Sequence, residues 1–183
     1  MRQVIDLIEA STRPAKLETT PLPYATNALA PSMSQATIDY HYENLTKAYA
    51  KNYNTDKGNK DFNRAGSYLH NKFWPQFKAP AGANAANRPK GAVLELIQAN
   101  FEDYEDFKQA FKEAATSIMG SGWAYLSTNG TIKTIKNHAV RTDIAMLVDM
   151  WEHSWALDYQ QDKGKYVDNI FKIIDWNVIN ERL

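Results

Sequence analysis

The apolar residues of this 183-residue chain change their spacing near residue 120, and this change limits the folds open to it. Upstream, apolar residues recur every three or four positions, which predicts helices over 35–54, 62–77, 91–101 and 103–119. Downstream, the stretch WAYLSTNGTIKTIKN predicts two strands joined at Asn129 and Gly130, and IAMLVDM predicts a third. A last helix is predicted over 165–181. Helices, three strands and a final helix indicate an α+β fold whose first two helices form an antiparallel hairpin.

The stretch KAPAGANAANRP is poor in large apolar residues and reads as a linker between two halves. We therefore predict an N-terminal tail over 1–20 with one short helix, a helical-hairpin domain over 21–88 and a C-terminal α/β domain over 89–183. The tail carries Asp6 and Glu9 and lacks the uninterrupted apolar core of a secretory signal. We expect a cytoplasmic protein, with organelle targeting by residues 1–20 left open.

Composition removes several classes of function. The 21 basic residues equal the 21 acidic ones, so the charge balance favours neither nucleic acid nor an acidic membrane surface as a partner. No apolar run reaches the roughly 18 residues that span a bilayer. The chain has no cysteine, so any metal site must use His, Asp, Glu or backbone oxygen.

Histidine is scarce, which makes each copy informative. Asp149 and His153 lie four residues apart where a predicted strand ends, and they form a short arm with one oxygen and one nitrogen donor. His41 and His70 each lie in the middle of one helix of the predicted hairpin. Together these four residues offer three nitrogens and one oxygen, which suits a first-row transition metal with a position left for solvent.

Other interpretations of the same residues stay open at this point. The Asp149 and His153 pair also fits an ion pair or a helix cap beside a surface histidine, and His41 and His70 also fit core histidines. Tyr49 lies two helical turns after His41, so its hydroxyl fits either a place beside the open metal position or the core. These patterns do not choose between redox chemistry, hydrolysis and a structural metal.

Five segments resemble the iron/manganese superoxide dismutase family, in the family's order and over the chain from Pro21 to the C-terminus. They are LPYATNALAPSMSQATIDYHY, LHNKFW, FEDYEDFKQAFKEAATSIMGSGWAYL, DMWEH and DWNVINERL. The resemblance implies an N-terminal helical hairpin, here shortened, and a C-terminal lobe with a three-stranded antiparallel sheet and flanking helices. It implies conversion of superoxide to dioxygen and hydrogen peroxide by one iron or manganese ion per subunit. The implied metal ligands are His41, His70, Asp149 and His153.

The resemblance also assigns residues around the metal. Tyr49 matches a gateway tyrosine, and His138 takes the place of a glutamine that bonds the metal-bound solvent, because Gly66 leaves the alternative glutamine position empty. Glu152 matches a glutamate that reaches the last histidine ligand of the other subunit, which implies a homodimer. Three tryptophans are expected to wall the site and keep it dry: Trp74, Trp123 and Trp151.

The chain departs from the family pattern at residues that line the entrance to the family's metal site. Leu45 replaces a second gateway histidine, Ala156 replaces the tyrosine that partners it, and Asn44 and Lys163 stand where a lysine and an arginine are usual. These changes predict a more apolar entrance with weaker electrostatic guidance. An active dismutase is the leading interpretation. The alternatives are a catalytically silent dismutase-like structural or binding subunit, and a different metalloenzyme on the same scaffold.

Overall fold

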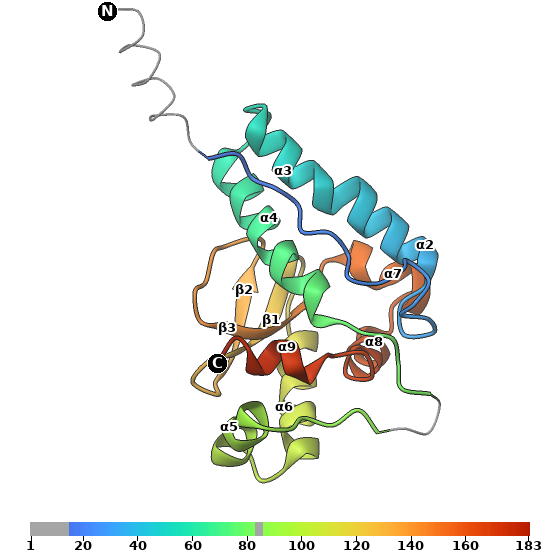
Figure 1. The fold of residues 1–183 in the computed structure, drawn as a ribbon, viewed down its shortest axis with the longest axis vertical. Coiled ribbons are helices and arrows are strands. Elements are labelled where there is room, and N and C mark those ends of the chain that lie inside the picture. Colours follow the sequence, from blue (N-terminus) through green and yellow to red (C-terminus); the bar gives the residue numbers. More distant parts are fainter. Residues whose placement is uncertain (1–14, 83–85) are drawn as a thin grey trace, which may run out of the picture.

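The computed structural model describes residues 15–82 and 86–183, and it places a helical hairpin against a three-stranded sheet and its flanking helices (Figure 1). The α+β class and the arrangement of hairpin, sheet and helices are thus as predicted. Residues 15–20 run along the hairpin without regular secondary structure. The rest of the tail, in which a short helix was expected, lies outside the described residues. The domain boundaries at 20 and 88 stay predictions.

The first helix of the hairpin is continuous but changes type in its middle. It consists of α2 (Gln35–Ile38), a π-helical stretch (Asp39–Thr46) and α3 (Lys47–Asn54). Ser34 caps its start, because Ser34 Oγ accepts a hydrogen bond from Thr37 N at 3.2 Å. The wider π turn adds a residue to the helix, and such stretches are frequent at functional sites.

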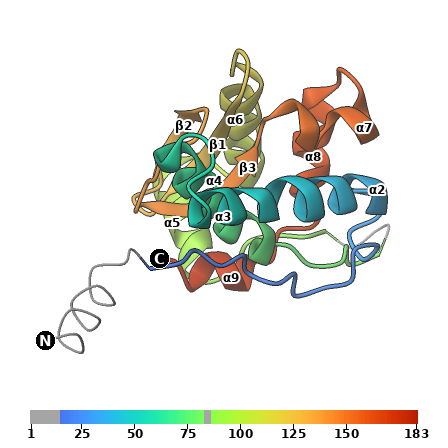
Figure 2. The same ribbon diagram turned by 90° about the horizontal axis from the view of Figure 1, so that it is seen from above.

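The second helix, α4 (Lys60–Phe73), follows a five-residue turn and is capped by the side chain of Asn59. It ends in a 3₁₀ turn over Trp74–Gln76, where Pro75 cannot continue the α-helical hydrogen bonding. The helix predicted over 62–77 is therefore confirmed but ends four residues early. α3 and α4 pack side by side as the expected hairpin (Figure 2).

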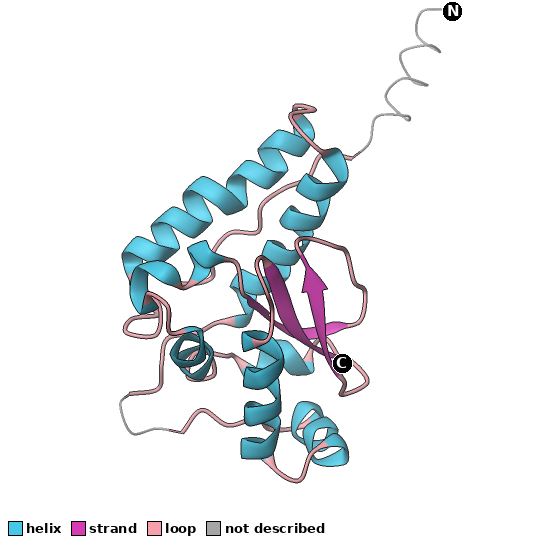
Figure 3. Cartoon of the chain, turned by 180° about the vertical axis from the view of Figure 1, so that it is seen from behind, coloured by secondary structure: helices cyan, strands magenta, loops and turns pink. Residues whose placement is uncertain are grey.

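The sheet consists of β1 (Gly122–Ser127), β2 (Ile132–Lys136) and β3 (Ile144–Asp149) in the antiparallel order β2-β1-β3. The predicted turn is confirmed, and Gly130 adopts a φ of 85° that suits glycine. Every residue of β1 and β3 is buried, because helices cover the sheet (Figure 3). Among them, α4 packs on β3, and α6 (Tyr104–Thr116) packs on β1 and β2.

The single helix predicted over 165–181 is wrong. The chain forms α8 (Lys163–Ile170) and α9 (Trp176–Asn180), separated by a segment in which Ile174 pairs with Phe77 as an isolated β-bridge. Asp175 restarts the helix by accepting a hydrogen bond from Asn177 N. The break lets the C-terminal segment bond to the end of the hairpin.

Two smaller differences concern the rest of the C-terminal half. Helix α5 (Ala92–Asn100) begins and ends one residue inside the range predicted over 91–101. A 3₁₀ turn (Glu152–Ser154) and α7 (Ala156–Tyr159) follow β3 and were not predicted. Helix α7 lies beside α2, and Ser34 N donates to Asp158 Oδ2 at 2.8 Å. None of the helices within the described ranges is long and apolar enough to cross a bilayer.

Candidate metal centre

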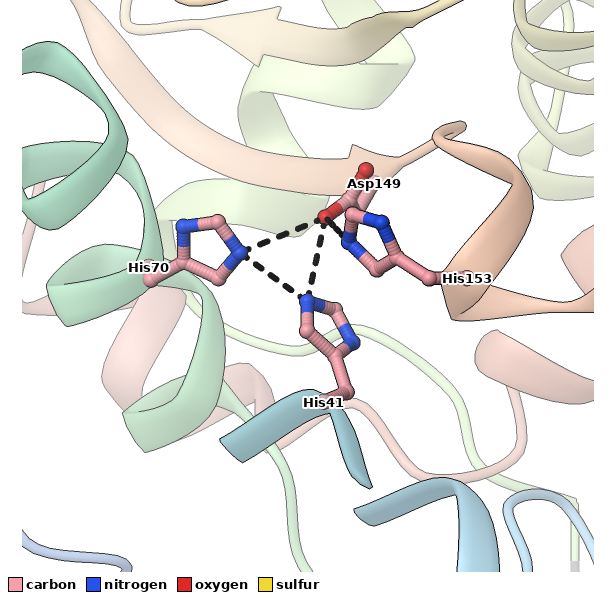
Figure 4. A group of neighbouring side chains, drawn as sticks. All are labelled: His41, His70, Asp149 and His153. Atoms are coloured by element: carbon pink, nitrogen blue, oxygen red, sulfur yellow. Dashed lines mark hydrogen bonds and ion pairs between the residues drawn. The ribbon is translucent and has the colours of Figure 1, made fainter. Parts of the chain in front are cut away.

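Four side chains from four separate segments converge where the hairpin meets the sheet (Figure 4). His41 comes from the π-helical stretch, His70 from α4, Asp149 from the last position of β3 and His153 from the following 3₁₀ turn. Three of the side chains are fully buried, and that of His153 is 14% exposed. The structure thus brings together the four residues that the sequence predicts as ligands.

The donor atoms are spaced as ligands of one ion. Asp149 Oδ2 lies 3.3 Å from His41 Nε2, 3.5 Å from His70 Nε2 and 3.6 Å from His153 Nε2. His41 Nε2 and His70 Nε2 are 2.9 Å apart. Two donors about 2.1 Å from a common ion lie about 3.0 Å apart at an angle of about 90° and about 3.6 Å apart at about 120°. These four separations fall within this range or at its edge, and all four donor atoms lie within 4.8 Å of one another.

Hydrogen bonding within the described residues leaves these atoms without other partners. Asp149 Oδ2 and His153 Nε2 are buried and accept or donate no hydrogen bond. His70 Nδ1 donates to the carbonyl of Gly66 at 2.7 Å, so the neutral ring presents a lone pair at Nε2 toward the cluster. Buried atoms without partners are costly, and a bound cation satisfies them.

Burial keeps the imidazoles in the form that binds metal. It lowers the pKa of His41 to about 4, against an opposing effect of Asp149, and it lowers the pKa of His70 well below its ordinary value. Burial by itself would raise the pKa of Asp149. The contacts with His153 and His41 lower this pKa by more than burial raises it, so the net shift is downward. Near neutral pH, neutral His41 and His70 therefore face an ionised carboxylate, the protonation state that metal ligation requires.

Local sequence explains how the arm from β3 is shaped. Asp149 Oδ1 accepts a hydrogen bond from Trp151 N at 2.8 Å, which leaves Oδ2 to face the histidines. The same bond turns the chain out of the sheet and into the 3₁₀ turn that carries His153. The four-residue spacing therefore brings Asp149 Oδ2 and His153 Nε2 close together.

The three predicted tryptophans do surround the cluster. Trp74 lies edge-on to His41 with ring centroids 4.8 Å apart, and Trp123 lies edge-on to His70 at 5.0 Å. Trp123 also pairs with Asp149 across β1 and β3. Trp151 packs against His153 at 5.7 Å. These rings make the site largely apolar around its donors.

His138 and Tyr49 form a hydrogen-bonded pair beside the cluster. Trp123 Nε1, which can only donate, bonds His138 Nδ1 at 3.1 Å, so the proton of the neutral imidazole lies on Nε2. His138 Nε2 donates to the Tyr49 hydroxyl at 3.0 Å. Asn137, at a left-handed φ of 53°, follows β2 and precedes this histidine. Burial lowers the pKa of His138 to about 4 and raises that of Tyr49.

Two residues that support the site were not singled out for these roles by sequence reasoning. Thr46 Oγ1 donates to the carbonyl of His41 at 3.0 Å and accepts from Trp74 Nε1 at 2.9 Å. A Cβ added to Gly66 would lie 2.7 Å from the Tyr49 ring, so this glycine gives the tyrosine its place. Thr46 follows His41 by five residues, and only knowledge of the π-helical stretch makes that spacing meaningful.

Among the residues that depart from the family pattern, Leu45 and Ala156 are half-buried and Asn44 is exposed. Glu152, which matches the family, is also exposed. Lys163 Nζ donates to the carbonyl of Ile118 at 3.4 Å and lies 5.4 Å from the centre of the Trp155 ring.

Comparison with known proteins agrees with this centre. Residues 89–182 match the C-terminal domain of iron/manganese superoxide dismutases, and residues 16–59 match their alpha-hairpin domain. An iron superoxide dismutase of Bacteroides fragilis is 37% identical over 88% of this chain and 96% of its own length. A manganese/iron enzyme of Porphyromonas gingivalis is 33% identical over the same shares, and a manganese enzyme of Acinetobacter baylyi is 31% identical over 92% and 87%. The chain therefore belongs to the iron/manganese superoxide dismutase family.

Proposed function

We propose that this protein is a superoxide dismutase that uses one iron or manganese ion per subunit. The observation that carries the proposal is the buried group of three imidazole nitrogens and one carboxylate oxygen, spaced for a single ion and without other partners among the described residues. This donor set suits iron and manganese. The retained donors also argue against a catalytically silent subunit.

In this proposal His41, His70, Asp149 and His153 hold the ion. A bound iron or manganese ion would supply one-electron chemistry. Two superoxide anions and two protons give dioxygen and hydrogen peroxide, so each cycle consumes two protons. The carboxylate offsets part of the positive charge of the ion, and the tryptophan rings limit access of bulk water.

We assign the holding of a proton near the site to Tyr49 and His138. Because His138 Nε2 donates to the Tyr49 oxygen, the hydroxyl hydrogen of Tyr49 is free to be donated elsewhere. The Tyr49 ring lies 5.1 Å from that of His70, which places it beside the cluster. We infer that the pair helps to hold solvent at the centre, as the family's glutamine does.

We also propose a homodimer formed around the 3₁₀ turn that carries His153. Glu152 is exposed next to this ligand. It stands where the family's glutamate reaches the last histidine ligand of the other subunit. Met119 is 90% exposed, and the adjacent carbonyl of Ile118 accepts from Lys163. Exposed methionines are enriched at protein interfaces, which makes Met119 a candidate contact residue. Sedimentation velocity tests this: Met119→Glu should lower the dimer fraction and Leu183→Glu, at another exposed apolar residue, should not. A monomeric wild type refutes the dimer.

The activity is tested by loading the purified protein with iron or manganese separately and measuring metal content and superoxide consumption. We expect activity with at least one metal. His70→Ala should lose most bound metal and activity while its circular dichroism is kept. Asn63→Ala, which removes another buried polar side chain from α4, is the matched control and should keep both. A loaded wild type that consumes no superoxide refutes the proposal. The cytoplasmic location stays a prediction.

A further inference from the structure

A polar groove of about 680 Å³ lies between the start of α4 and the segment that follows β2. Glu152 and His153 do not line it. Its side chains combine polar, cationic and aromatic groups, and those that matter here are Asn59, Phe62, Arg64, Lys136, Asn137 and His138. The five-residue turn between α3 and α4 brings the first turn of α4 to this groove.

The inner end of the groove reaches the metal centre. His138 lines the groove and also bonds Tyr49, whose ring lies against the ligand His70. The ring of Phe62 lies 4.7 Å from that of His138 and 6.1 Å from that of Trp151. These aromatic rings separate the groove from the donor cluster by a single layer of side chains.

The charge in the groove favours an anion. Arg64 lies 3.3 Å from Asp61, and this exposed pair is nearly neutral. Lys136 is exposed and forms no ion pair with any described residue. Its ammonium group is therefore the uncompensated charge of the groove.

The two entrance positions at which the family has a lysine and an arginine offer little such charge in this chain. Asn44 is neutral, and the ammonium group of Lys163 is held between the Ile118 carbonyl and the Trp155 ring. Guidance of a small anion toward the centre must then come from other cations.

We propose that this groove is an approach route for the anionic substrate, superoxide, with Lys136 as its guiding charge and Phe62 at its inner end. The inference rests on the proposed dismutase function. It assigns Lys136 an electrostatic role at a distance and no part in the chemical steps.

The test compares Lys136→Gln and Lys136→Glu with Lys90→Gln. Lys90 is exposed at the start of α5, and its substitution changes the net charge by the same amount as Lys136→Gln. In water, a unit charge about 10 Å from the path of an anion changes the local anion concentration about twofold. We expect the second-order rate constant with superoxide at about 10 mM ionic strength to fall about twofold in Lys136→Gln and about fourfold in Lys136→Glu. The difference should shrink at about 0.15 M, where the Debye length is about 8 Å.

Azide, titrated into the loaded protein and followed by absorbance, gives a readout that does not depend on turnover. Its dissociation constant should rise in the order wild type, Lys136→Gln, Lys136→Glu, and should not change in Lys90→Gln. Circular dichroism and thermal melting check that each variant folds. If both Lys136 variants match Lys90→Gln in rate and in azide affinity, the groove is not an approach route. If the loaded wild type consumes no superoxide, the proposed function fails, and the azide series alone decides the role of the groove.

Discussion

Replacing Thr46 with valine should lower the free energy of unfolding of the metal-free protein by more than the loss of one hydrogen bond would. The Thr46 hydroxyl donates to the carbonyl of His41 within the π-helical stretch and accepts from the indole nitrogen of Trp74. All three residues are buried. Valine keeps the shape of threonine, so the change removes these two hydrogen bonds and leaves the packing nearly intact.

The magnitude follows from what the hydroxyl leaves behind. The indole N–H of Trp74 would stay buried without an acceptor, which costs about 1–3 kcal/mol, and loss of the bond to the His41 carbonyl adds about 1 kcal/mol. We therefore expect the free energy of unfolding to fall by about 3 kcal/mol. For a domain of this size that corresponds to a fall in melting temperature of about 6–12 °C.

Urea unfolding of the metal-free protein, followed by circular dichroism and tryptophan fluorescence, measures the loss. A double-mutant cycle with Trp74→Phe isolates the indole bond, because phenylalanine has no N–H to leave unpaired. In that background Thr46→Val should cost only about 1 kcal/mol. Thr134→Val, on the exposed side of β2, is the matched control and should change stability by less than about 0.5 kcal/mol.

The reasoning fails if Thr46→Val costs no more than the Thr134→Val control. It also fails if the effects of Thr46→Val and Trp74→Phe are additive, because the indole would then not depend on the threonine. A loss of stability with full additivity would point to packing alone.

Three further predictions concern the surroundings of the metal. Since His138 has a pKa of about 4 when folded and about 6.5 when unfolded, the unfolded state binds more protons between these values. The free energy of unfolding of the metal-free protein should therefore fall as the pH is lowered through this window. Measured by urea unfolding, His138→Gln should remove about 2 kcal/mol of the fall between pH 7 and pH 5, and an unchanged pH dependence would contradict this. Gly66→Ala should displace the Tyr49 ring, which a new Cβ would approach to 2.7 Å, so turnover should fall at unchanged metal content, whereas unchanged turnover would show that the ring adapts. Leu45→His with Ala156→Tyr should raise turnover above wild type and above either single change, and equal rates would show that the missing pair does not limit the enzyme.

The regular parts of the fold were predictable because their signals are local. Strand alternation with Asn129 and Gly130 at the turn predicted the hairpin of β1 and β2, and helical spacing predicted α4 and α6. The break between α8 and α9 was not predictable in this way. Ile173 and Ile174 continue a helical pattern, yet they leave the helix because Ile174 pairs with Phe77, nearly a hundred positions earlier.

The ligands of the candidate centre were predictable for a different reason. Histidine is rare in this chain, and the spacing of Asp149 and His153 matches a family motif. The supporting contacts were not predictable from one sequence. Thr46 bonds Trp74, and Gly66 lies under the Tyr49 ring. Both contacts depend on where two helices meet, and neither threonine nor glycine as a residue type indicates such a role.

The most direct test of the metal centre is anomalous diffraction from crystals of the protein loaded with iron or manganese, recorded at the absorption edge of that metal. We predict one anomalous peak per subunit, with His41 Nε2, His70 Nε2, His153 Nε2 and Asp149 Oδ2 each within about 2.0–2.3 Å of it. A peak elsewhere in the chain, or an ion held by fewer than these four atoms, would contradict the assignment of this cluster as the metal site.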